Sequence, residues 1–135
     1  MLDRIKPLIS FGAEGHGIRL AAVLPQSGVA VGDISLWLVS REHRQGEIGF
    51  VVHPDHQGHG YATEGAAALV ELGFRQFDLH RIVGSADARN IGSARVMEHL
   101  GMRREALFRE NELVKGEWSN EVIYALLATE WAARG

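Results

Sequence analysis

The chain has 135 residues, of which 46% are hydrophobic and 23% charged, and these values are ordinary for one globular domain. Its formal net charge of −3 lacks the basic surplus of nucleic-acid-binding proteins, so such a partner is not expected. The absence of cysteine excludes disulfides, zinc–thiolate sites and cysteine nucleophiles, and it fits a cytoplasmic location. No apolar run approaches the roughly 20 residues of a membrane span, and residues 1–7 lack the long apolar stretch expected of a signal peptide.

The pattern of apolar residues predicts a single domain, residues 1–135, built on one central sheet. Alternating or continuous apolar character predicts six strands, over residues 18–24, 29–39, 47–52, 81–86, 104–108 and 121–127. The polar segments 25–28, 41–46 and 109–120 are predicted to be turns or connections. Strands interleaved with helices in this way indicate an α/β or α+β layer fold.

Helical spacing is clearest between Ala62 and Phe77, where apolar residues recur on one face. A second helix is predicted from Asn90 to Leu100, with Gly101 closing it in the left-handed conformation. A short helix is also expected over residues 2–11, although Pro7 fits poorly inside it.

A turn with two glycines, Gly58 and Gly60, separates the strand that ends at Val52 from the helix that follows. The first turn of a helix carries main-chain N–H groups without partners and a partial positive charge, and a diphosphate satisfies both. Glycine lets the backbone approach phosphate oxygens closely. The alternative is an ordinary strand-to-helix turn, because a Walker A lysine and the third glycine of a dinucleotide fingerprint are both missing.

The same turn, Gln57-Gly58-His59-Gly60-Tyr61-Ala62, resembles the Q/R-x-x-G-x-G/A signature of the GNAT superfamily of acyl-CoA N-acyltransferases. A second segment, Asn90-Ile91-Gly92-Ser93 followed by His99-Leu100-Gly101-Met102, resembles the N-x-x-S…LGF pattern of the ribosomal-protein-alanine acetyltransferase (RimJ/RimL-like) branch. With Gly116-Glu117-Trp118 and the last strand, the similarity spans residues 18–131. It implies a mixed, mostly antiparallel sheet flanked by helices, and transfer of an acetyl group from acetyl-CoA to an amine.

The resemblance also implies which residues contact acetyl-CoA. The main chain of the third predicted strand, residues 47–52, is expected to pair with the pantetheine arm. The main-chain amides at the start of the next helix are expected to hold the diphosphate. Asn90 is expected to bind the pantetheine and Ser93 to lie near the sulfur, although Asn90 also suits a helix N-cap. The coenzyme-binding residues predicted in this way are Phe50, Val51, Val52, Gln57, Gly58, His59, Gly60, Tyr61, Ala62, Thr63, Asn90 and Ser93.

Glu47 is the candidate general base. A neutral amine must attack the thioester, so a group that removes a proton, directly or through water, is useful. Glu47 opens the strand that leads to the coenzyme turn; the alternative is a salt-bridged or solvated glutamate at a strand end. Glu42, His43 and His53 are weaker candidates.

Ser93 is the candidate acid for the leaving thiolate. Many members of the superfamily use a tyrosine from this helix, but the matching region here holds Met97. Tyr61 lies in the phosphate turn and Tyr124 in the last strand, so neither is an obvious replacement. Without cysteine or a Ser-His-Asp pattern, direct attack of the amine on the thioester is the expected mechanism.

A metal site is the rival interpretation of the turn, because His53, His56 and His59 are spaced three apart. Pro54 breaks a helix that would align them, and Asp55 is the only carboxylate nearby. No metal cofactor is therefore predicted.

The start of the chain departs from the family, which usually has a strand and one or two helices before the strand at residues 18–24. The first strand and helix are therefore expected to be missing, and in the family this region helps to form the acceptor cleft. A coenzyme A-binding module without transferase activity is the second hypothesis. Protein N-termini, amino acids, polyamines and amine-bearing antibiotics stay open as acceptors, with the branch favouring an N-terminus, and a homodimer is the default assembly.

Overall fold

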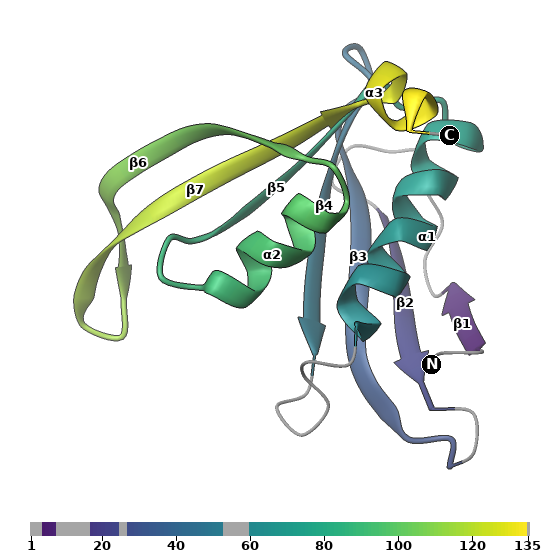
Figure 1. Cartoon of the computed structure of the whole chain (residues 1–135), viewed down its shortest axis with the longest axis horizontal. Helices are drawn as coiled ribbons and strands as arrows, with labels where there is room; N and C mark the ends of the chain where they lie inside the picture. The colour runs from purple at the N-terminus through teal and green to yellow at the C-terminus, as the bar shows by residue number, and fades with distance from the viewer. Residues whose placement is uncertain (1–3, 8–16, 25–26, 53–59, 135) are drawn as a thin grey trace.

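The computed structural model describes residues 4–7, 17–24, 27–52 and 60–134 of the chain. Its seven strands form one sheet in the spatial order β1-β2-β3-β4-β5-β7-β6 (Figure 1). Neighbouring strands are antiparallel except β4 and β5, which run parallel. In chain order the elements are β1 Arg4–Pro7, β2 Gly17–Val23, β3 Ala30–Ser40, β4 Gln45–Val52, α1 Tyr61–Arg75, β5 Arg81–Asp87, α2 Ile91–His99, β6 Arg103–Val114, β7 Glu117–Leu127 and α3 Ala128–Ala133.

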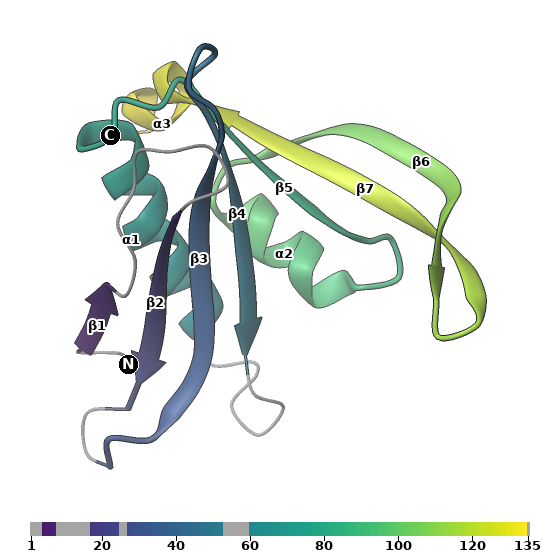
Figure 2. The same cartoon turned by 180° about the vertical axis from the view of Figure 1, so that it is seen from behind.

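The longer helices, α1 and α2, lie on the same face of the sheet. Helix α1 packs against β3 and β4, and α2 packs against β5 and α1. Figure 1 shows α1 in front of these strands, and Figure 2 shows it behind them. We call the other side of the sheet the open face; Ser35, Trp37, Glu47 and Gly49 belong to it, and no described helix covers it.

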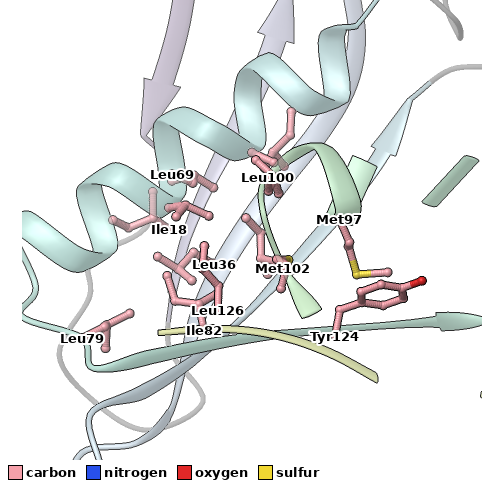
Figure 3. Packing of buried hydrophobic residues seen from close by; sticks show 14 of the residues in the cluster. Ile18, Leu36, Leu69, Leu79, Ile82, Met97, Leu100, Met102, Tyr124 and Leu126 are labelled. Atoms are coloured by element: carbon pink, nitrogen blue, oxygen red, sulfur yellow. The ribbon is translucent and has the colours of Figure 1, made fainter. Parts of the chain in front are cut away.

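The hydrophobic core fills the space between the two helices and the sheet. On β3, Ile34, Leu36 and Leu38 are buried, because alternate side chains of a strand point to the same side. On α1 the buried residues recur at helical spacing and are Tyr61, Gly65, Ala66, Leu69, Val70 and Gly73. Figure 3 shows Leu36, Leu69, Ile82 and Leu126 from four different elements gathered in this core.

Most predicted elements are confirmed, including the left-handed Gly101 after α2, with φ of 88°. The helix expected over residues 2–11 is wrong at Arg4–Pro7, which forms β1 and pairs antiparallel with β2. Pro7 explains the error, since its ring is incompatible with a helix interior but is tolerated in an edge strand. A strand therefore precedes β2, where none was expected.

The polar segment 109–120 is a second correction, because it forms the outer part of a long hairpin instead of a loose connection. Strand β6 continues to Val114 and β7 begins at Glu117. Lys115 and Gly116 make the tight turn with φ of 50° and 80°, the left-handed conformation that two-residue hairpin turns require. The tip of the hairpin extends away from the helices, and most of its side chains are solvent-exposed, including those of Leu113 and Trp118 (Figure 1). The short helix α3, which follows β7, was not predicted. None of the helices in the described ranges is both long and apolar enough to cross a membrane.

Gly65 sets how closely α1 approaches the sheet. A Cβ at this position would lie 2.6 Å from Cδ1 and 3.0 Å from Cγ1 of Ile34, a fully buried side chain on β3. Such contacts force either the helix or the isoleucine to move. Glycine is therefore required here by packing against β3.

We expect Gly65→Ala to lower the free energy of unfolding by about 1–3 kcal/mol, the usual cost of overpacking a core. Chemical denaturation followed by circular dichroism measures the change. Gly92→Ala in α2 is the matched control, because its added Cβ meets only Asn90 Oδ1 at 3.6 Å. Equal stabilities of the two variants would contradict the close helix–sheet contact.

Candidate functional site

The centre of the candidate site is the place where β4 and β5 separate. Their parallel pairing covers three residue pairs, Gln45 with Arg81, Gly46 with Ile82 and Glu47 with Val83. Beyond that point β4 stays paired with β3, while β5 turns away and stays paired with β7. Figures 1 and 2 both show the two strands diverging from a common apex.

This divergence leaves one edge of β4 without a strand partner. Phe50, Val51 and Val52 pair with β3 on one side, and no described strand pairs with their other side. An unpaired edge presents alternating N–H and C=O groups that an extended ligand can bind as an added strand. The Phe50 side chain packs against the core, whereas that of Val51 is 69% exposed. The predicted pantetheine-binding strand is therefore sterically and chemically suited to that role.

Helix α1 begins at Tyr61, nine residues after Val52 in the chain, and packs against β4. Its N-cap residue, Gly60, has φ of 78° and offers no side-chain acceptor. Within the described part of the chain, no hydrogen bond to the main-chain N–H of Ala62 or Thr63 is present. These amides lie in the helix turn where an anion binds best. The other predicted residues of the turn, Gln57, Gly58 and His59, lie outside the described residues.

Asn90 caps α2, as its residue type predicted. Its side-chain Oδ1 accepts a hydrogen bond of 3.0 Å from the main-chain N–H of Ser93. Ser93 is itself half-buried in the first turn of the helix. The N-cap role is therefore part of the fold, and any contact of Asn90 with a ligand would come in addition.

An ion-pair network holds the turn that carries Asn90. Arg89 donates from Nη2 to Asp87 Oδ2 at 2.9 Å and from Nη1 to Glu117 Oε2 at 3.1 Å. The Arg89 guanidinium keeps the pKa of the Asp87 carboxyl well below its usual range. The Ala88 N–H also donates to the main-chain oxygen of Asn120 at 2.8 Å. The N-terminus of α2 is thereby attached to β7, independently of any ligand.

Met97 fills the helix side of the apex, in the region where many superfamily members have tyrosine. A Cβ on Gly84 would lie 2.8 Å from its Sδ and 3.4 Å from Cγ2 of Ile48, so three elements meet closely. Tyr124 lies next to Met97 (Figure 3), but its hydroxyl donates to Glu98 Oε2 at 3.4 Å. Burial raises the pKa of Tyr124. Its bond to Glu98 directs the Tyr124 hydroxyl to α2.

Glu47 lies at the last pair before β4 and β5 diverge, and it belongs to the open face. Its carboxylate makes no hydrogen bond or ion pair with any described residue. Burial raises the pKa of Glu47 above its ordinary value, and the negative charge of Glu121 on β7 raises it further. A half-buried carboxyl without a partner and with a raised pKa is better suited to proton transfer than to a structural ion pair.

The weaker base candidates have different surroundings. Glu42 and His43 are exposed, lie 4.0 Å from each other, and belong to the turn at the other end of β4. His53, His56 and His59 all lie outside the described residues, so the metal alternative stays untested. Elsewhere in the described ranges, no three histidine, aspartate or glutamate side chains gather as metal ligands would.

Trp37 and Glu121 accompany Glu47 on the open face, and the sequence alone did not single them out. Trp37 is the cross-strand partner of Glu47, and its ring lies over Gly49. Successive side chains of a strand point to opposite faces of the sheet, so the apolar Leu36 and Leu38 place Trp37 on the other face. This alternation could have been read from the sequence. Glu121 lies far away in sequence, and only the strand order brings it near.

Loss of the α2 cap in Asn90→Ala is expected to lower the free energy of unfolding by about 1 kcal/mol. Asn90→Ser is the matched control, since serine accepts the same main-chain hydrogen bond and should retain most of the stability. Thermal or urea unfolding measures both variants. Equal destabilisation by alanine and serine would show that the cap contributes little.

The chain resembles known acetyltransferases along most of its length. Residues 2–103 match the family model described as an acetyltransferase (GNAT) domain. The uncharacterized N-acetyltransferase YnaD of Bacillus subtilis is 39% identical over 84% of this chain and 66% of its own length. The putative ribosomal N-acetyltransferase YdaF of the same species is 31% identical over 88% of this chain and 64% of its own length.

A solved structure of a GNAT-family acetyltransferase from Bacillus anthracis has the same fold. It superposes with a TM-score of 0.76 at 38% identity, covering 83% of this chain and 67% of that one. The chain thus spans just under two thirds of the length of YnaD and YdaF.

Proposed function

The chain belongs to the GNAT acetyltransferase family, and from that membership we propose that it transfers the acetyl group of acetyl-CoA to a primary amine. The main support is the divergence of β4 from β5, which frees a strand edge beside the N-terminus of α1. One extended ligand with a diphosphate at one end and amide groups along its arm matches both features.

In this proposal the pantetheine amides pair with the free edge of Phe50, Val51 and Val52. The diphosphate is held by the main-chain amides at the start of α1, from Gly60 to Thr63. Gln57, Gly58 and His59 complete that turn, and Asn90 contacts the pantetheine while it caps α2. No metal takes part, because a neutral amine can attack a thioester directly once it is positioned.

The chemistry then requires two proton movements. The amine nitrogen attacks the thioester carbonyl carbon, the C–S bond breaks, and coenzyme A leaves as a thiolate. Glu47 accepts the proton that the amine loses, directly or through one water, and Ser93 or water returns a proton to the thiolate. The carboxyl of Glu47, which is half-buried and has no partner among the described residues, supports its role as the base.

Gly60→Glu is expected to abolish acetyl-CoA binding, because it places a negative charge where the diphosphate docks. Isothermal titration with acetyl-CoA measures the dissociation constant. Gly60→Ala is the matched control, since any non-glycine residue is strained at φ of 78° but alanine adds no charge. Equal affinity of the glutamate and alanine variants would contradict binding at this helix end.

Glu47→Gln is expected to lower kcat by about 10²- to 10⁴-fold, the usual contribution of a general base, with little change in acetyl-CoA affinity. The wild-type kcat should rise with pH through the raised pKa of Glu47, since the carboxylate form accepts the proton. Glu121→Gln removes a negative charge that raises the pKa of Glu47. The rise of kcat on the acid side of the pH profile should therefore move to lower pH in this variant. A glutamine variant with unchanged kcat and the same pH profile would exclude Glu47 as the base.

For the acceptor, the resemblance to the ribosomal-protein-alanine acetyltransferase branch and to YdaF favours a protein N-terminal amine. A thiol-release assay over N-terminal peptides, amino acids, polyamines and amine-bearing antibiotics tests this choice. Binding of acetyl-CoA without turnover on any amine would instead favour a coenzyme A-binding module. Sedimentation of the active protein tests the proposed homodimer.

A further inference from the structure

The indole of Trp37 is the largest side chain next to Glu47 on the open face. Trp37 and Glu47 are direct cross-strand partners on β3 and β4. A Cβ on Gly49 would lie 3.2 Å from Cζ3 and 3.4 Å from Cη2 of Trp37. The six-membered ring of Trp37 therefore lies over Gly49 of β4, which has no side chain that would occupy this space.

This position places the ring at the apex of the divergence. Gly49 follows Glu47 by two residues, and Glu47 belongs to the last β4–β5 pair. The Trp37 side chain is only partly buried, and its indole N–H has no hydrogen-bond partner among the described residues. An aromatic ring and a carboxylate that pairs with no described residue thus lie on neighbouring strands where the free edge of β4 begins.

An aromatic ring beside a carboxylate is a surface that binds an ammonium group and its neighbouring carbons. The face of tryptophan attracts cations more strongly than that of tyrosine or phenylalanine. Most primary alkylamines are protonated at pH 7, so they arrive as cations and must lose a proton before they react. Arylamines arrive neutral, so neither the cation–π attraction nor the charge of the carboxylate acts on them.

We propose that Trp37 forms the acceptor-binding surface of the enzyme and selects alkylammonium acceptors over arylamines. The inference rests on the proposed function and adds a specificity-determining residue to it. The competing explanation is structural, namely that the ring only covers Gly49 in the sheet, as aromatic residues do beside strand glycines.

The test compares Trp37→Leu, Trp37→Phe and Trp118→Leu in the thiol-release assay, with benzylamine and aniline beside the best alkylamine of the panel. Trp37→Leu should raise the KM for alkylamines about three- to thirtyfold, raise the KM for aniline much less, and leave the acetyl-CoA dissociation constant unchanged. Trp37→Phe should recover part of the loss, because it keeps a ring. Trp118, which is 62% exposed on the β6–β7 hairpin, is the matched control and should behave as wild type.

Two results would overturn the inference while leaving the proposed function intact. One is an unchanged alkylamine KM in Trp37→Leu, and the other is an equal rise for alkylamines and aniline. Circular dichroism and acetyl-CoA titration show whether each variant is folded. Wild-type protein that releases no thiol with any amine would refute the proposed function, and this inference with it.

Discussion

The arrangement of the candidate site depends on where the parallel pairing of β4 and β5 stops. Each strand keeps a full partner on its outer side, β3 for β4 and β7 for β5, so both remain in the sheet while they diverge. Met97 lies on the helix side of the divergence and packs closely against Gly84, which is also near Ile48. Main-chain groups that lack a partner are costly unless water or a ligand satisfies them, which is why we propose this edge as a binding site.

The same divergence separates two sides of the proposed reaction. The helix side carries the N-termini of α1 and α2, whose amides and cap residue suit a long, anionic coenzyme. The open face carries Glu47 and Trp37, which suit a small cation that must be deprotonated. The two sides meet at the Glu47–Val83 pair, and attack of the amine on the thioester is proposed to occur there.

Local patterns in the sequence predicted most of the fold. The buried stripe of α1, the Asn90 cap and the left-handed Gly101 follow from short-range rules, and the structure confirms them. The outer part of the β6–β7 hairpin, residues 109–120, was missed because its residues are mostly polar or solvent-exposed and lack the apolar alternation of a half-buried strand. Glu47 was chosen as a candidate base from its place in the chain, but its proximity to Glu121 depends on strand order, which no local pattern encodes.

The most direct test is a crystal structure of the chain with acetyl-CoA. The account predicts pantetheine amides hydrogen-bonded to the free edge of β4 between Ile48 and Val52, and the diphosphate at the amides of Ala62 and Thr63. The thioester should then lie near Glu47 and Trp37, at the apex. Coenzyme bound elsewhere, with this edge of β4 occupied only by water or by protein groups, would contradict the account.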